Sequence, residues 1–334
     1  MTDVSKDDNS NDEDDSDNSD NDSNDDGRKV SRFAQSTGND GTKNSQLAVG
    51  FKNDQSRSFV VRGSKIDIFK TDRDNTYALR FSTPINNIKS MEGKLFSPQK
   101  IILHNQDQDL LMMKPGDTHQ IYKMDLEYGK VTEEWKIHDK IPIDNIIPEK
   151  KYSQLSITQT LIGFNESSIY RIDPGVSGNI SVTEETYSYA TRTQFNCAVT
   201  TGNGELAIGS KKGDIRLFDK LNIRAKTLLS GLGDSIKRID TTENCKFIIA
   251  TCKNYLLLIN TDLPGNNGTT GFTKAMGSNK PHPKRLTIRP EHVALIDIEI
   301  NFTPARFNTG ENEEKAIITT SCRFLIIRDF EKKK

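Results

Sequence analysis

The feature that most constrains the fold is a short apolar hairpin pattern that recurs along the chain. Its clearest copy is ELAIGSKKGDIRLFD at 205–219, in which two apolar runs flank a Gly- and Lys-rich turn. Such a pattern predicts two antiparallel strands. Further copies lie at 59–70, 109–125, 160–173, 247–260 and 316–329. Sustained apolar periodicity at helical spacing is hard to find, so we predict an all-β chain.

The copies recur at a measurable period. The second strand usually ends in Asp or Asn, at Asp125, Asp173, Asp219, Asn260 and Asp329, and these markers are 48, 46, 41 and 69 residues apart. A period near 40–45 residues, with about four strands in each unit, is typical of the blades of a β-propeller. One blade cannot bury both of its faces, whereas a ring of blades packs each sheet against the next.

The hairpins predict six or seven four-stranded blades over residues 45–334. Six hairpins are visible, and the long intervals at 70–125 and 260–329 leave room for another unit. Two apolar runs at 47–51 and 59–62 precede the first full hairpin. We therefore predict that the N-terminal strand completes the last blade and locks the ring.

The first 27 residues have a different composition, with 12 Asp or Glu and one Lys among Asn and Ser. They offer no apolar surface to offset the entropy of ordering, so residues 1–44 are predicted to be a disordered acidic tail and linker. Without the first 27 residues, 45 basic and 35 acidic side chains remain, which gives the rest of the chain a charge of about +10. This asymmetry suggests an anionic partner, or the tail in that role.

Four serines of the tail have an acidic residue three positions later: Ser5, Ser10, Ser19 and Ser23. Acid-directed kinases favour this pattern, and phosphates there would add to the negative charge. They are candidate phosphorylation sites. The alternative is a linker that only keeps the chain soluble.

A second charged segment, KPHPKRLTIRPEH at 280–292, is a candidate partner-binding loop. Its basic side chains are Lys280, His282, Lys284, Arg285, Arg289 and His292. Three prolines in 13 residues restrict its shape, which lowers the entropy lost on binding, and Arg pairs well with carboxylate and phosphate. The alternative is a solvated basic loop in which Leu286 and Ile288 support a strand.

No motif for catalysis, metal or cofactor binding stands out. There is no GxSxG elbow and no GxxxxGK[ST] phosphate loop, and the five histidines lack a metal-ligand spacing. The four cysteines form no CxxC pair and are expected to be buried free thiols. We therefore expect neither enzyme activity, nor a cofactor, nor a metal.

Two further features bear on where the chain works. No apolar run reaches the roughly 18–20 residues that cross a bilayer, so no integral membrane segment is expected. The acidic N-terminus is the electrostatic opposite of a secretory signal or a mitochondrial transit peptide, which predicts a cytoplasmic location.

The hairpins and spacers also resemble a known family. The strings FVVRGSKIDIFK, YKMDLEYGKVTEEWKIHD, KKGDIRLFD, ATCKNYLLLI and RLTIRPEHVA are similar to the C-terminal WD-repeat-like propeller of the fungal vacuolar import and degradation family, member twenty-seven, in the same order and over about residues 45–330. The chain departs from regular WD repeats, because the strand-ending Trp-Asp is replaced, for example by Met124-Asp125 and Phe218-Asp219, and Trp135 lies elsewhere. The resemblance implies a divergent propeller and a part in delivering proteins to the vacuole for degradation. It brings no catalytic residue.

We therefore predict a non-enzymatic scaffold that binds partner proteins in cytoplasmic trafficking or vacuolar import and degradation. The alternative is a propeller that binds phosphoinositide or nucleic acid on a basic surface. Aromatic side chains for base stacking are missing around 280–292, which weighs against nucleic acid. A propeller hydrolase is a third class, for which no site argues.

Overall fold

A computed structural model describes residues 44–52, 55–71, 79–137, 142–153, 160–174, 181–263, 268–294, 299–309, 314–321 and 324–332. These residues belong to one compact unit of the chain. Within them lie six antiparallel sheets and one short helix, α1 (Pro290–Val293). The predicted all-β fold is confirmed.

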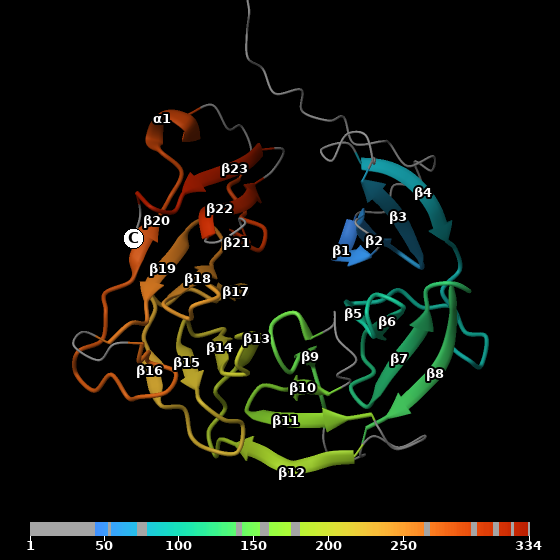
Figure 1. Ribbon diagram of the computed structural model, residues 1–334, viewed down its shortest axis with the longest axis horizontal. Helices are drawn as coiled ribbons and strands as arrows, with labels where there is room; N and C mark the ends of the chain where they lie inside the picture. The colour runs from blue at the N-terminus through green and yellow to red at the C-terminus, as the bar shows by residue number, and fades with distance from the viewer. Residues whose placement is uncertain are drawn as a thin grey trace, which may run out of the picture. The chain divides into compact units, whose positions relative to one another are not determined.

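The sheets are the six blades of a propeller, and they follow one another around a central axis (Figure 1). Blades 1 to 3 consist of β1 (Asn44–Lys52), β2 (Gln55–Arg62), β3 (Lys65–Thr71) and β4 (Leu79–Ile85); β5 (Lys100–His104), β6 (Asp109–Met113), β7 (Gln120–Asp125) and β8 (Lys130–Lys136); and β9 (Asn145–Pro148), β10 (Leu161–Phe164), β11 (Ser168–Asp173) and β12 (Ser181–Ser188). Blades 4 to 6 consist of β13 (Phe195–Thr200), β14 (Leu206–Ser210), β15 (Ile215–Phe218) and β16 (Thr227–Leu229); β17 (Arg238–Thr241), β18 (Phe247–Thr251), β19 (Leu256–Asn260) and β20 (Lys284–Leu286); and β21 (Arg306–Thr309), β22 (Glu314–Ser321) and β23 (Phe324–Asp329).

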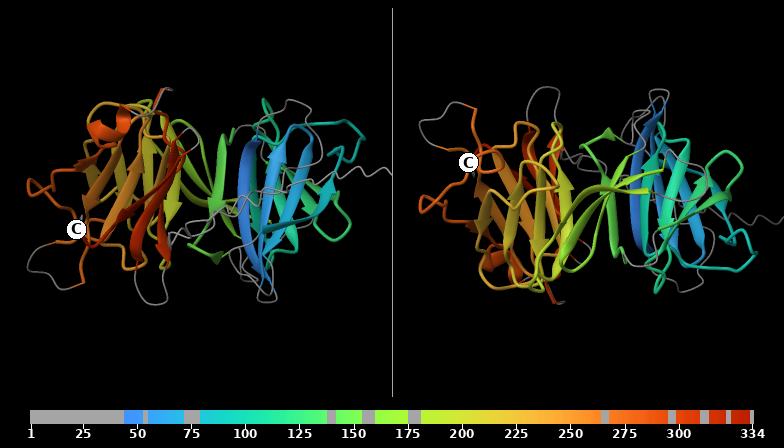
Figure 2. Two further views of the ribbon diagram at one scale, coloured as in Figure 1. Left: turned by 90° about the horizontal axis from the view of Figure 1, so that it is seen from above. Right: turned by 90° about the horizontal axis from the view of Figure 1, so that it is seen from below.

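Within each blade, every strand pairs with the next one along the chain, and the first strand of the blade lies nearest the axis. The strands cross the ring from one face to the other, as the edge-on views of Figure 2 show. The six predicted hairpins are the second and third strands of the six blades. The prediction of six or seven blades resolves to six, because the long intervals hold β4 and β5, and β20, α1 and β21.

The Asp or Asn that marks the hairpins has a local structural role at the end of the third strand. The Asp125 carboxylate accepts hydrogen bonds from the backbone N–H groups of Glu127 at 2.7 Å and Tyr128 at 3.1 Å. The Asn260 side chain accepts one from the backbone N–H of Asp262 at 2.8 Å. These are Asx turns, which end a strand and reverse the chain. The marker therefore predicts a turn and does not require the polar network of a regular WD repeat.

The apolar core is divided among the blade interfaces. Five clusters of buried side chains each lie between two consecutive blades, from blades 1 and 2 to blades 5 and 6. The cluster between blades 4 and 5, for example, contains Ile215, Leu217, Ile239 and Leu257. Burial of this apolar surface is the main stabilising contribution to the fold.

The predicted closure of the ring by the N-terminal strand is wrong. β1 pairs with β2 inside blade 1, with Lys52 opposite Gln55, and in the described residues blade 6 has three strands. A two-residue connection closes this hairpin at a low entropic cost, which favours the local pairing. On β1 and β23, the strands at the two ends of the described ring, Leu47, Val49, Leu325 and Ile327 are exposed.

Candidate functional site

The predicted basic loop lies at the outer edge of blade 5. Lys284 and Arg285 belong to the outermost strand β20, and Arg289 precedes α1. All six of its basic side chains are exposed: Lys280, His282, Lys284, Arg285, Arg289 and His292. Leu286 and Ile288 point into the core between blades 5 and 6, as the alternative reading of the loop expects.

Two of the loop's arginines already have partners within the propeller. The Arg285 guanidinium stacks over the Tyr255 ring, 4.6 Å from its centroid, and an Arg289 nitrogen lies 3.9 Å from a Glu291 oxygen. Arg285 and Arg289 are nevertheless exposed, so both cations stay accessible. The partner-binding role of this loop stays a prediction. Ser5, Ser10, Ser19 and Ser23 lie outside the described residues.

Three of the innermost strands of the propeller begin with a cation. Lys100, Arg238 and Arg306 are the first residues of β5, β17 and β21, the innermost strands of blades 2, 5 and 6. Burial lowers the pKa of Lys100, and the charges of Arg238 and Arg306 lower it further; burial and the Arg306 charge lower the pKa of Arg238. These strands stand at different places around the axis (Figure 1).

The pairing register places two of these cations at the same height along the axis. Lys100 is paired with Met113, the last residue of β6, and Arg238 with Thr251, the last residue of β18. Equivalent positions in two blades therefore carry a cation. Burial is the largest cause that lowers the pKa of Lys100, to about 7, and repulsion by the two arginines adds to it.

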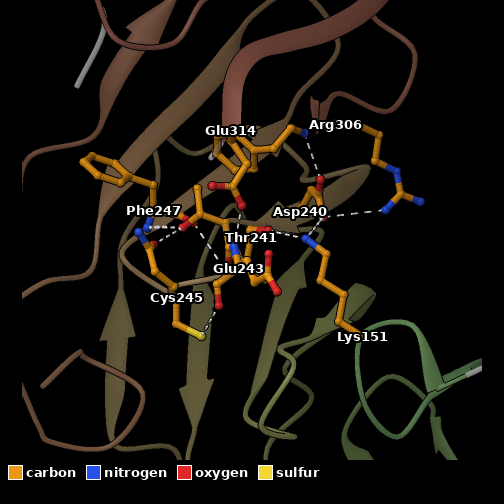
Figure 3. A network of polar contacts seen from close by, with 11 residues as sticks. Lys151, Asp240, Thr241, Glu243, Cys245, Phe247, Arg306 and Glu314 are labelled. Atoms are coloured by element: carbon orange, nitrogen blue, oxygen red, sulfur yellow. Dashed lines mark hydrogen bonds and ion pairs between the residues drawn. The ribbon is translucent and has the colours of Figure 1, made fainter. Parts of the chain in front are cut away.

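Asp240 is the carboxylate that meets this cluster, and it joins three blades (Figure 3). Its side chain is almost fully buried, with one oxygen 3.3 Å from Lys151 Nζ and 3.7 Å from an Arg306 nitrogen. Its other oxygen accepts a hydrogen bond from the backbone N–H of Phe307 at 2.9 Å. Lys151 follows β9 of blade 3 and also donates to the carbonyl oxygen of Thr241. This network links blade 3 to blades 5 and 6 across the axis.

A second set of contacts in Figure 3 fixes the turn between β17 and β18. A Glu314 carboxylate oxygen on β22 accepts a hydrogen bond from the backbone N–H of Glu243 at 2.5 Å. The Cys245 thiol donates to the carbonyl oxygen of Glu243 at 3.5 Å. Burial raises the pKa of Cys245 to about 11. These contacts are structural, because they pair backbone groups of the turn that have no partner in the sheet.

The three cysteines that the structure describes, Cys197, Cys245 and Cys252, are buried and free, as expected from the sequence. Burial raises the pKa of each thiol, so none has the thiolate character of a catalytic nucleophile. Cys322 lies outside the described residues. Over that same part of the chain, no group of three or more His, Cys, Asp or Glu side chains has the arrangement of a metal site. No helix there is long and apolar enough to span a membrane.

A groove of about 740 Å³ lies between blades 1 and 2. Part of its wall is apolar, from side chains such as Ile68, Ile85 and Val131, and its charged lining residues are Arg57, Lys70, Lys89, Lys130 and Glu127. At its rim, Met91 is 63% exposed and Tyr128 is 72% exposed. The groove thus combines apolar contact area with an excess of positive charge.

Comparison with known proteins identifies the family. The VID27 C-terminal WD40-like domain matches residues 42–334. This chain belongs to that family. Two proteins named "Vacuolar import and degradation protein 27" are similar to it: that of Schizosaccharomyces pombe is 45% identical over 85% of this chain, and that of Saccharomyces cerevisiae is 39% identical over 83%. The match covers 36% of the length of each relative.

A solved structure agrees on the fold. The propeller resembles the β-propeller domain of Cps50 (Swd1) from Myceliophteria thermophila, with a TM-score of 0.56 and 10% identity, over 86% of this chain and 83% of that one. At this identity the likeness concerns the fold alone. It confirms the predicted WD-repeat-like propeller, as the family match confirms the predicted resemblance.

Sequence reasoning did not find the axial cations. A signal was present, because Lys100 and Arg238 each stand nine residues before the first strand of a predicted hairpin. The three strands that they begin have only five, four and four residues and carry mixed side chains, so their cations look like ordinary surface residues. That they begin the innermost strands of blades 2, 5 and 6 is known only from the arrangement of the blades.

Proposed function

We propose that this propeller is a non-enzymatic binding platform for proteins, which acts in the cytoplasm in vacuolar import and degradation. The names of both relatives support the process. The match covers only 36% of each relative, and the names describe the whole proteins. That this domain takes part in the named process is therefore part of the proposal. The WD40-like fold supports a binding role, since such propellers present large faces and grooves for partners.

The observation that carries the proposal is the groove between blades 1 and 2. Exposed apolar side chains as large as Met91 and Tyr128 beside a concave surface are typical of protein-binding sites. Methionine adapts to different contact shapes, and tyrosine supplies a large contact area with few rotatable bonds. The groove therefore has the composition of a binding hot spot.

The charge of the groove indicates the chemistry of its occupant. Arg57, Lys70, Lys89 and Lys130 outnumber the single lining carboxylate, Glu127. We expect an extended protein segment in which apolar side chains alternate with Asp or Glu, because such a segment fills the apolar wall and neutralises the basic rim. A purely acidic segment would leave the apolar wall in water.

A displayed random-peptide library selected on the full chain tests this. Peptides that combine acidic and apolar residues are expected, and the double variant Met91→Ala, Tyr128→Ala should weaken their binding by about tenfold or more. Leu232→Ala is the matched control, because Leu232 is 51% exposed and does not line the groove. Selected peptides that bind the double variant as tightly as the wild type would contradict the proposal.

The alternative function is binding of an anionic ligand, such as a phosphoinositide, by the basic loop at 280–292. The exposure of all six of its basic side chains supports this alternative. Replacing Lys280 and Lys284 by Gln should then reduce binding to anionic vesicles, with a steep loss of affinity as salt is raised. Nucleic acid stays the less favoured ligand, for want of aromatic side chains in the loop.

A further inference from the structure

Blades 6 and 1, the two ends of the described ring, each have an apolar face that no other blade covers (Figure 1). The five clusters of buried side chains join the other consecutive blades, and none in the described residues joins blade 6 to blade 1. We call these two faces the seam. It is formed by Leu47 and Val49 on β1 and by Leu325 and Ile327 on β23, and all four side chains are exposed.

The blade 6 wall of the seam repeats a surface that blade 5 buries. Side chains alternate along a strand, so Leu325 and Ile327 point away from Ile326, which packs against the core between blades 5 and 6. On the third strand of blade 5, Leu256 and Leu258 hold the corresponding positions. Those two are 0% and 2% exposed because blade 6 covers them, whereas Leu325 and Ile327 are 64% and 58% exposed.

The blade 1 wall shows the same contrast. Ala48 packs against the core between blades 1 and 2, so Leu47 and Val49 on either side of it face the opposite way. On β5, the equivalent strand of blade 2, Ile101 and Leu103 face blade 1 and are buried. Both walls of the seam therefore have the composition of a blade interface.

The repeat indicates what kind of structure covers such a wall. At each of the five other interfaces, the cover is an antiparallel sheet with apolar side chains of its own. Residues 1–43 have too few apolar side chains to build one, since they contain five: Met1, Val4, Val30, Phe33 and Ala34. The hairpin at 205–219 alone contains six.

We propose that the seam binds a β-hairpin of a partner protein, which has apolar side chains on both faces and packs between blades 6 and 1 as an additional blade. One face of the hairpin contacts Leu325 and Ile327, and the other contacts Leu47 and Val49, just as blade 4 packs between blades 3 and 5. An isolated hairpin is marginally stable in water, and burial of both of its faces offsets the cost of ordering it. The seam is separate from the groove between blades 1 and 2, which none of these four residues lines.

A synthetic peptide with the sequence of residues 205–219 is a suitable probe, because it is a hairpin of this chain with two apolar faces. Within the propeller, Ile208 packs toward blade 3 and Leu217 toward blade 5. The labelled peptide is titrated with the full chain, and binding is followed by fluorescence anisotropy. The wild-type chain should bind it. A control peptide with Ile208→Ser and Leu217→Ser, which loses an apolar side chain from each face, should bind at least about tenfold more weakly.

Variants of the full chain test the two walls separately. Ile327→Glu and Val49→Glu should each weaken peptide binding by about tenfold or more, because the new charge would lose hydration under the bound hairpin. Both positions are exposed, so the melting temperature should stay close to that of the wild type. The matched control Leu232→Glu, at another exposed position, should bind like the wild type. So should the groove variant Met91→Ala, Tyr128→Ala, which separates this proposal from the one made for the groove.

Three results would overturn the proposal. The first is a wild-type chain that binds the peptide no better than the control peptide. The second is a variant, either Ile327→Glu or Val49→Glu, that binds the peptide as the wild type does. The third is a chain that sediments alone as a dimer which Ile327→Glu dissociates, because a second copy would then cover the seam.

Discussion

Replacing Lys100 by methionine should stabilise the folded protein, and the gain should depend on pH. Burial and the neighbouring Arg238 and Arg306 charges lower the pKa of Lys100 from 10.5 to about 7, with the Cys197 thiol acting in the opposite sense. Each unit of pKa shift corresponds to about 1.4 kcal/mol. At pH 7 the folded state therefore carries a penalty of up to about 4 kcal/mol, which methionine removes while keeping a side chain of similar length.

The sign of the pH dependence follows from proton binding. Between pH 7 and 10.5 the unfolded chain holds a proton on Lys100 that the folded protein has released, so wild-type stability rises with pH in this window and falls toward pH 7. The advantage of Lys100→Met should shrink from up to about 4 kcal/mol at pH 7 to about 2 kcal/mol at pH 9. Partial access of water to this half-buried residue makes both figures upper limits.

Urea denaturation at pH 7 and pH 9, followed by the fluorescence of the single tryptophan, measures this difference. Trp135 is 5% exposed, so its emission should shift to longer wavelength on unfolding. Lys226→Met, at an exposed position, is the matched control and should change stability by less than about 0.5 kcal/mol. A Lys100→Met protein that is less stable than the wild type, or equally more stable at both pH values, would refute the reasoning.

Three further predictions test the packing and the polar network. Asp240→Asn should lower the free energy of unfolding by about 2–4 kcal/mol, because it leaves Lys151 and Arg306 without their carboxylate. The control is Asp262→Asn, which loses an exposed ion pair of 3.5 Å with Lys246. It should cost less than about 1 kcal/mol in the same urea titration. Gly209→Ala should lower the melting temperature, at a cost of about 1–3 kcal/mol, because the added Cβ would lie 2.8 Å from Ile239 Cδ1. In the control Gly202→Ala the added Cβ meets no atom within 4 Å, so stability should be nearly unchanged. In a Cys322→Ser protein, a chromogenic disulfide reagent at about pH 8 should react with Cys197, Cys245 and Cys252 only after unfolding. All three thiols are buried and have raised pKa values. Rapid reaction of the folded protein would contradict this.

The middle of every blade was predictable because its signal is local. Two adjacent apolar strands and a polar turn lie within about 15 residues, and the Asp or Asn at the end of the second strand caps the following turn, as Asp125 does. The role of β1 was not predictable in the same way. Its alternating pattern fits any sheet edge, and pattern alone does not say whether it pairs with β2 or with a distant blade.

The candidate sites also differ in whether their residues are close together in the sequence. The basic loop at 280–292 is continuous in sequence, so its charge could be seen there, and the structure places it on β20 and beside α1. The groove between blades 1 and 2 and the axial cations are built from separate strands. Lys100 and Arg306 come from different blades, and hydrophobic period, which describes one strand or helix at a time, carries no information about how separate strands are arranged.

The excess of positive charge predicted from composition therefore has two different physical settings. On the loop at 280–292 the cations are in water, where ions within a Debye length of about 8 Å screen them and each contact contributes about 0–1 kcal/mol. On the inner strands, burial lowers the pKa of Lys100 and of Arg238, so a positive charge there costs free energy that an exposed cation does not cost. Net charge alone does not distinguish these two settings, because burial decides what each cation costs the fold.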